Sequence, residues 1–127
     1  MIIGAHFLLF SKDAERDRAF LRDVLQFRSV DAGHGWLIFA LPPSEMAVHP
    51  GNAAEKPQAE PGMAEVAFYL MCDNLDATIE WLREKGVKYR PIDAERWGRK
   101  TTIQLPSGQW IGLYQPLHPL AIQNASA

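Results

Sequence analysis

The chain has 127 residues, 47% of them hydrophobic, and a formal net charge of -2 at pH 7. This length fits one compact domain with an apolar core, and the balanced charge gives no electrostatic reason to expect a nucleic acid or an anionic membrane as partner. A single cysteine, Cys72, excludes an internal disulfide, and no stretch approaches the roughly 20 apolar residues that a membrane-spanning helix needs.

Residues 1–10 are apolar but short, and they lack the basic start and the small-residue cleavage site of a signal peptide. Together with the single cysteine, this predicts a cytoplasmic protein. We expect residues 2–10 to form a buried strand, because β-branched and aromatic side chains are frequent there.

A helix is expected over residues 14–25, with Ser11 or Asp13 capping its first turn. Apolar side chains at helical spacing form one stripe along it: Phe20, Leu21, Val24 and Leu25. Its charged residues are assigned to a solvated face: Arg16, Arg18, Arg22 and Asp23. Gln26 follows the helix at a position where a glycine would end it most easily.

Three further strands are expected in the first half. Residues 28–31 are a weak candidate, residues 32–35 form a glycine-containing turn, and residues 36–41 are a strong candidate. Two prolines then break the chain, and residues 45–49 return as an antiparallel strand. Residues 51–63 are rich in proline, glycine and polar side chains, so they are predicted to be a linker or a mobile flap.

The second half repeats this order. A strand over residues 65–71 precedes a helix over residues 75–85, which Asp73 or Asn74 caps and Gly86 ends. Its core stripe is Leu75, Ile79 and Leu82. Strands over residues 87–89, 101–105 and 109–114 follow, with a polar loop at 91–100 and a tail from 117 to 127.

The chain therefore reads as a strand–helix–three-strand unit written twice: module 1 over 1–50, the linker over 51–63 and module 2 over 64–116. Because three strands in a row follow each helix, the predicted class is α+β and not a doubly wound α/β fold. The two βαβββ modules are expected to form a curved mixed sheet whose concave faces share a pocket.

Several short motifs, in order and at matching spacing, resemble those of one family. They lie at residues 20–27 (FLRDVLQF), 73–77 (DNLDA), 82–87 (LREKGV), 106–109 (PSGQ) and 111–116 (IGLYQP). The chain thereby resembles the vicinal oxygen chelate superfamily, which includes glyoxalase I, extradiol dioxygenases, and fosfomycin- and bleomycin-resistance proteins. The resemblance covers nearly the whole chain and implies a homodimer, with the modules paired within one chain or swapped between two.

The resemblance also implies where a divalent metal would bind. Metal enzymes of the family place His or Glu at four inward strand positions, and His6 matches the first. The second and third fall at Met46 and Val66, or at Glu45 and Glu65 if the register differs by one residue. Gly112 stands at the fourth and cannot ligate through a side chain. No complete metal site is predicted, although His6, Glu45 and Glu65 remain candidates.

Six residues are candidates for lining a ligand pocket: His6, Trp36, Glu45, Glu65, Trp97 and Trp110. An aromatic-lined cup suits a planar or apolar ligand, whereas the alternative is that the tryptophans belong to a core or a dimer interface. Cys72 is interpreted as a small buried hydrophobic residue in preference to a reactive thiol.

The leading hypothesis for function is a metal-free protein that binds a small molecule, similar to bleomycin-resistance proteins. The first alternative is a divalent-metal-dependent lyase or dioxygenase that uses His6 and nearby carboxylates. The second is a structural or regulatory domain with a vestigial cup.

Overall fold

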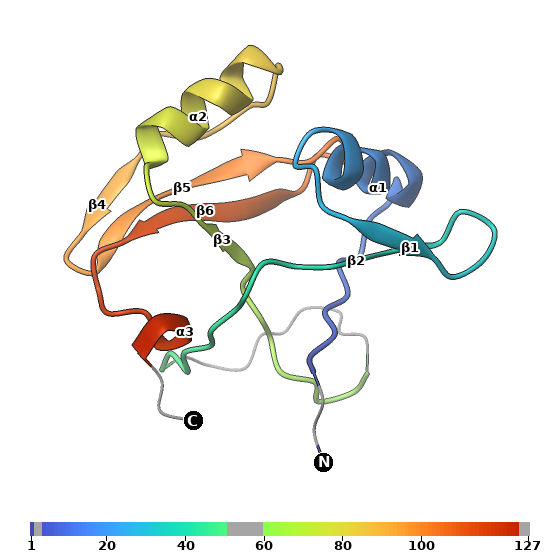
Figure 1. Ribbon diagram of the computed structural model, residues 1–127, viewed down its shortest axis with the longest axis horizontal. Helices are drawn as coiled ribbons and strands as arrows, with labels where there is room; N and C mark the ends of the chain where they lie inside the picture. Colours follow the sequence, from blue (N-terminus) through green and yellow to red (C-terminus); the bar gives the residue numbers. More distant parts are fainter. Residues whose placement is uncertain (2–3, 51–59, 125–127) are drawn as a thin grey trace.

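The computed structural model describes residues 1, 4–50 and 60–124, which form two sheets and three helices (Figure 1). The elements in chain order are α1 (Ala14–Asp23), β1 (Ser29–Asp31), β2 (Leu37–Phe39), β3 (Tyr69–Met71), α2 (Leu75–Glu84), β4 (Asp93–Glu95), β5 (Gly98–Gln104), β6 (Trp110–Pro116) and α3 (Ala121–Asn124). Strands β1 and β2 form a hairpin, and the other four form a mixed sheet in the order β3-β6-β5-β4. The predicted α+β class is confirmed.

The four-stranded sheet is the strand–helix–three-strand unit that was predicted for the second half. Strand β3 pairs in parallel with β6, opposing Tyr69 to Gly112, whereas β6 with β5 and β5 with β4 are antiparallel. The helix α2 makes the crossover that this one parallel pair requires.

The middle of this unit differs from prediction. The expected strand at 87–89 contributes one isolated bridge, Tyr89 to Ile103, and β4 lies inside the expected loop at 91–100. The Arg90 amide still donates to the Thr102 carbonyl at 3.1 Å, but Pro91 has no amide hydrogen to continue the ladder. The three residues of β4 are all exposed, so no apolar alternation marks them in the sequence.

Both long helices begin at the predicted caps. The Asn74 side chain accepts from the Ala77 amide at 3.0 Å, and the Asp13 side chain accepts from the Arg16 amide at 3.4 Å. Gln26 adopts a φ of 62°, the left-handed conformation that a glycine would take at no cost. This costs about 1 kcal/mol for a residue with a Cβ atom.

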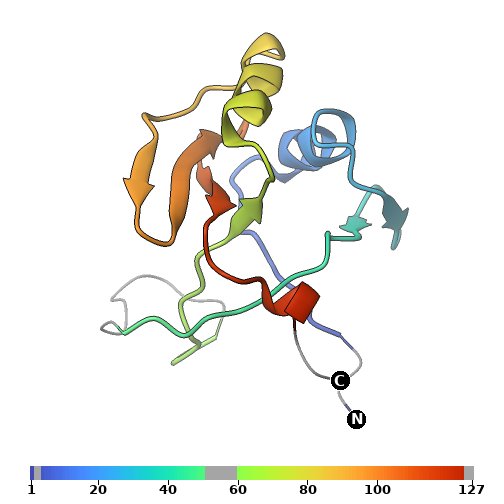
Figure 2. The same ribbon diagram turned by 60° about the vertical axis from the view of Figure 1, so that its left-hand side comes forward.

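Helices α1 and α2 lie on the same face of the four-stranded sheet and share one core with it (Figures 1 and 2). The buried apolar residues come from both helices, the segment after α2, and strands β5 and β6 with their connecting turn: Phe20, Leu75, Ile79, Leu82, Val87, Ile103, Leu105, Ile111 and Leu113. Phe20 of α1 therefore packs into the core of the second module, which joins the two halves of the chain.

A buried carboxylate also joins the halves. Asp17 of α1 is 6% exposed, and its Oδ1 accepts a hydrogen bond from the Ser107 amide at 3.0 Å, in the turn between β5 and β6. The sequence analysis identified neither this burial nor this contact.

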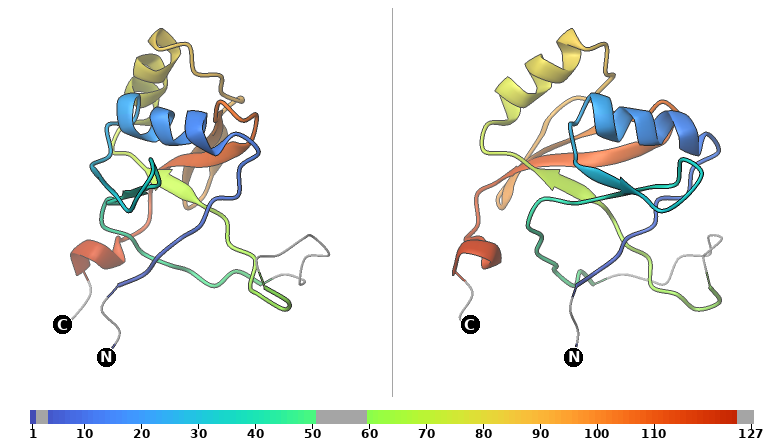
Figure 3. Two further views of the ribbon diagram at one scale, coloured as in Figure 1. Left: turned by 90° about the vertical axis from the view of Figure 1, so that its right-hand side faces the viewer. Right: turned by 45° about the vertical axis from the view of Figure 1, so that its right-hand side comes forward.

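The first module is less complete than predicted. Residues 4–10 and 45–49, both expected to be strands, pair with no strand among the described residues, and the strand predictions for these positions are wrong (Figure 3). Strand β3 is also shorter than expected. A strand needs a neighbour for its backbone hydrogen bonds, and neither segment has one within the described part of the chain. Residues 51–59 of the predicted linker lie outside the described residues.

Among the described residues, no helix has the length and apolar character to cross a membrane.

Candidate ligand-binding face

The four-stranded sheet has one face covered by α1 and α2 and a second face, here called the open face, that points away from them. Side chains alternate across a strand, and Thr101, Ile103, Ile111 and Leu113 are buried toward the helices. The residues that alternate with them on β5 and β6 therefore project from the open face, and so does Tyr69 of β3, which pairs with Gly112. The full set is Tyr69, Lys100, Thr102, Gln104, Trp110, Gly112 and Tyr114.

Four rings gather at one end of the open face, and we call them the aromatic cluster: Tyr69, Trp97, Tyr114 and His118. The Tyr114 ring meets Tyr69 edge-on, with centroids 5.7 Å apart and planes at 87°. It meets Trp97 in the same way, at 5.7 Å and 75°. Edge-to-face pairs are favourable because the positive edge of one ring contacts the negative face of the other.

Two glycines give these rings their room on the sheet. A Cβ atom added to Gly112 would lie 2.0 Å from Cδ1 of Tyr69, so the Tyr69 ring occupies the space above Gly112. At Gly98, an added Cβ would lie 3.3 Å from Cδ2 of Tyr114 and 2.7 Å from the Gln115 carbonyl. A larger residue at either position would displace a tyrosine ring or the neighbouring strand.

The tail after β6 folds onto the cluster and holds it. The Leu117 amide donates to the Trp97 carbonyl at 2.8 Å, and Tyr114 Oη lies 3.0 Å from Nε2 of His118. His118 Nδ1 lies 2.9 Å from the Pro119 carbonyl, which can only accept, so Nδ1 carries the hydrogen. In the neutral ring Nε2 is then the acceptor, and the Tyr114 hydroxyl donates to it.

Glu45, a residue of the first module, also lies near the aromatic cluster. Its Oε1 accepts from the Ala121 amide at 3.0 Å, and Figure 2 shows the segment after β2 running toward α3 on the far side of the sheet from α2. Burial raises the pKa of the Tyr114 phenol, and the nearby Glu45 carboxylate raises it further. Tyr114 is therefore a hydrogen-bond donor at neutral pH and not a base.

Two cations lie over indole rings of the open face, Lys100 at the aromatic cluster and Arg90 near the start of β6. Lys100 Nζ lies 5.3 Å from the ring centroid of Trp97, and Arg90 Cζ lies 4.1 Å from that of Trp110. Glu95 Oε1 is 4.0 Å from Lys100 Nζ, the outer limit of an ion pair. These contacts place two positive charges on the aromatic surface.

The structure brings together only some of the six predicted pocket residues. Glu45 and Trp97 meet around Tyr114, and Trp110 projects from the same face of β6. Trp36 instead packs under Arg18 of α1, at 4.7 Å. His6 and Glu65 are exposed in the segments that precede α1 and β3.

Three residues of the cluster were missed by the sequence analysis: Tyr69, Tyr114 and His118. The signal for two of them was strand alternation, since Trp110, Gly112 and Tyr114 share one face of β6. His118 lies in a segment predicted only as a tail, and no periodicity indicated its position.

The metal site of the family does not fit these residues. Among the described residues, no three His, Cys, Asp or Glu side chains come together in a group that could hold an ion. At the fourth ligand position, the space beside Gly112 belongs to the Tyr69 ring. We therefore derive no chemical step through a metal.

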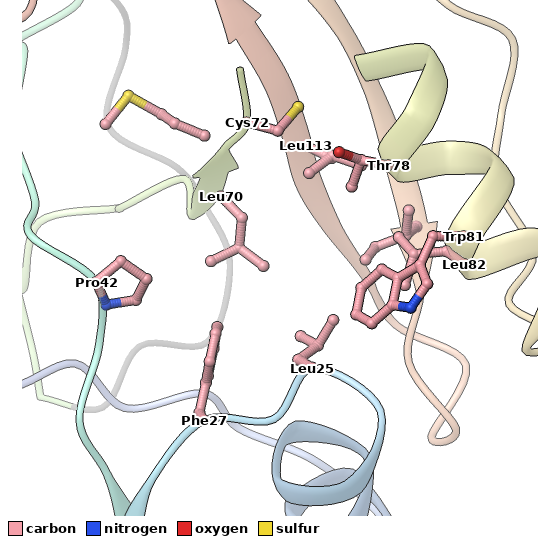
Figure 4. A pocket seen from close by; sticks show the side chains of 11 residues that line it. Leu25, Phe27, Pro42, Leu70, Cys72, Thr78, Trp81, Leu82 and Leu113 are labelled. Atoms are coloured by element: carbon pink, nitrogen blue, oxygen red, sulfur yellow. The ribbon is translucent and has the colours of Figure 1, made fainter. Parts of the chain in front are cut away.

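A separate apolar cavity of about 150 Å³ lies on the helix side, between the end of α1, α2 and β3 (Figure 4). Its lining includes Leu25, Phe27, Leu70 and Trp81. The Thr78 hydroxyl there donates to the Asn74 carbonyl at 2.8 Å, and most of the other lining side chains are apolar. We interpret this cavity as a packing gap between the modules.

Cys72, which also lines this cavity, is half-buried and free. Burial raises the pKa of its thiol, and Sγ donates to the Tyr114 carbonyl at 3.6 Å. Both observations agree with a packing role, since a reactive cysteine needs a lowered pKa.

Comparison with known proteins gives a family and a fold. The family model for the glyoxalase/bleomycin resistance protein/dioxygenase superfamily matches residues 4–113. No curated protein sequence matches the chain significantly.

Solved structures with the same fold include TnmS3, an antibiotic binding protein from Streptomyces sp. CB03234, at 24% identity and a TM-score of 0.61, covering 91% of this chain and 98% of that one. Lactoylglutathione lyase from Agrobacterium tumefaciens matches at 17% identity and 0.55, covering 84% and 88%. The fosfomycin resistance protein FosX from Mesorhizobium loti matches at 21% and 0.54, covering 98% and 100%.

Proposed function

The chain belongs to the glyoxalase/bleomycin resistance protein/dioxygenase superfamily, and we propose that it binds a small organic molecule on its open face without the help of a metal ion. The observation that carries this proposal is the position of Tyr69. Its ring fills the space beside Gly112, where the metal enzymes of the family need a carboxylate, and it presents an aromatic surface there.

The composition of the open face supports binding over a purely structural role. Tyr69 is 40% exposed and Trp97 is 43% exposed, so both rings offer surface for contact. Lys100 stands over the Trp97 ring and supplies a charged group that could fix an orientation. Aromatic surface with a few polar groups is the usual composition of a small-molecule site. The solved structure of TnmS3 shares this fold and is named as an antibiotic binding protein.

We further propose that a second copy of the chain completes the first module. Segments 4–10 and 41–50 expose large apolar side chains and pair with no strand among the residues that the structure describes; the most exposed are Leu8 at 60%, Phe10 at 61%, Met46 at 88% and Val48 at 90%. Adjacent apolar segments of this kind mark protein–protein contacts. Modules bounded at 1–50 and 64–116, in a cytoplasmic homodimer, are part of the same proposal.

Tryptophan emission tests the binding proposal. A library of small organic molecules is titrated into wild-type protein, Trp97→Phe and Trp36→Phe. We expect at least one molecule to change the emission of wild type and Trp36→Phe, and to change that of Trp97→Phe much less. The proposal is contradicted if no molecule binds, or if the response is lost in Trp36→Phe and kept in Trp97→Phe.

A further inference from the structure

We infer that the open face selects planar aromatic molecules that carry a negative charge. This inference rests on the proposed function, because it names the ligand class of the same face. Three observations support it: the angles within the aromatic cluster, the seat of Tyr69 on Gly112, and the two cations over the indole rings.

The cluster geometry favours a flat ligand. The Tyr114 ring meets the Tyr69 and Trp97 rings nearly at right angles. It therefore does not stack in parallel on the face of either ring. One side of the Tyr69 ring lies against Gly112, and the residue as a whole is 40% exposed. An aromatic ring from outside gains an offset stack on such a surface, whereas a puckered aliphatic ring gains only partial contact.

The charges favour an anion. Lys100 and Arg90 are positioned by indole faces, at 5.3 Å from Trp97 and 4.1 Å from Trp110. The carboxylate nearest to Lys100, on Glu95, is 4.0 Å away, and Glu45 already accepts from the Ala121 amide. A ligand carboxylate, sulfonate or phosphate can therefore pair with Lys100, which lies opposite Tyr114 and over Trp97, while its ring stacks on the tyrosines.

Three probes separate the contributions of ring and charge. Naphthalene-2-sulfonate is planar and anionic, naphthalene-2-sulfonamide is planar and neutral, and cyclohexanesulfonate is anionic but not planar. We expect the first to bind about tenfold more tightly than either of the others, because the sulfonamide lacks the charge contact and cyclohexanesulfonate lacks the stacking contact. The measurement is a titration of 15N-labelled protein followed by NMR.

The four tryptophans report the location in the same titration. We expect the indole N–H signals of Trp97 and Trp110 to shift with naphthalene-2-sulfonate. The signals of Trp36 and Trp81 should stay in place, because both indoles stack with helix residues, Arg18 and Lys85. Single Trp→Phe variants assign the four signals.

The chain supplies a matched control for each cation. Lys100→Gln removes the charge over Trp97 at the cluster and should weaken binding about threefold or more, and more than Arg90→Gln, which removes the charge over Trp110 farther along the face. Lys85→Gln and Arg18→Gln remove the equivalent charges over Trp81 and Trp36, and should leave binding unchanged. Tyr69→Leu should weaken both naphthalene probes and leave cyclohexanesulfonate unaffected.

The inference is overturned if the sulfonamide or cyclohexanesulfonate binds as tightly as naphthalene-2-sulfonate. It is also overturned if the helix-side controls lower the affinity as much as the open-face variants, or if none of the three probes binds. In each of these cases the proposed function is judged separately, by the emission titration of wild type, Trp97→Phe and Trp36→Phe with the whole library.

Discussion

At the scale of single residues, the identity of position 112 decides what the open face can hold. A glycine there has no ligand atom, and in this chain the absent side chain is replaced by the Tyr69 ring. The Tyr114 ring likewise lies against Gly98, where an added Cβ would be 3.3 Å from Cδ2 of the ring. The two glycines and the two tyrosines therefore form a packed unit in which each ring depends on a missing side chain.

Gly112→Ala tests this packing. The added methyl group would lie within 2.0 Å of the Tyr69 ring, so the ring must move, and overpacking of this kind costs about 1–3 kcal/mol. We expect urea unfolding to show that loss of unfolding free energy in Gly112→Ala. When Gly112→Ala is added to the Tyr69→Ala variant, the further loss should be much smaller. Equal losses in the two backgrounds would contradict the contact.

Predictions about single residues succeeded where they depended on that residue alone, and failed where they depended on a contact with a residue far away in the sequence. Gly112 was identified as unable to ligate, and this follows from its identity alone. Tyr69 could not be assigned to the same spot, because the parallel pairing that opposes Tyr69 to Gly112 joins residues more than forty positions apart. Asp17 was missed for a related reason, since its partner Ser107 lies in the other module.

At the scale of elements, the helices were predicted well and the strands of the first module poorly. Caps and apolar stripes are local signals, and both were found where expected in α2. A strand over residues 4–10 or 45–49 depends on a partner that the sequence pattern does not specify, and the chain itself does not provide one in the described structure. The apolar character of these segments predicted burial, whereas in the described structure their large apolar side chains are exposed.

The contact between α1 and the β5–β6 turn is the second element-scale feature, and Asp17→Ala tests it. The substitution leaves the buried Ser107 amide without an acceptor, which costs about 1–3 kcal/mol. Asp23→Ala is the matched control on the same helix, because Asp23 makes a fully exposed ion pair with Arg22, and exposed pairs contribute little to stability. We expect the Tm of Asp17→Ala to be clearly lower than that of Asp23→Ala. Similar Tm values for the two variants would argue against a stabilising contact between α1 and the β5–β6 turn.

At the scale of the whole molecule, the family and the α+β fold were predictable because many weak motifs occur in the right order along nearly the whole chain. The arrangement of the modules was not, since pairing within a chain and pairing between chains use the same strands and the same apolar residues. The exposed segments 4–10 and 41–50 favour pairing with a second copy.

Val48→Asp tests that association. Val48 is 90% exposed in the single chain, so an aspartate there should disturb the fold of one copy little. If a second copy covers it, an unpaired charge is buried at the contact and association should weaken at least tenfold. Sedimentation equilibrium should give a dimer for wild type and for the control Ala94→Asp on exposed β4, and a monomer for Val48→Asp. A monomeric wild type, or a dimeric Val48→Asp, would contradict the association.

The claim of metal-free binding on an aromatic open face is tested most directly by the metal content of the purified protein. The protein is prepared without a chelator or an affinity tag, analysed for metals, and then titrated with Ni(II), Zn(II), Mn(II) and Fe(II). We expect no ion held in proportion to the protein and no tight binding in the titration, because Tyr69 occupies the space beside Gly112. Close to one tightly held ion per subunit, lost in His6→Ala or Glu45→Gln, would contradict the account and make the metal-dependent alternative the correct one.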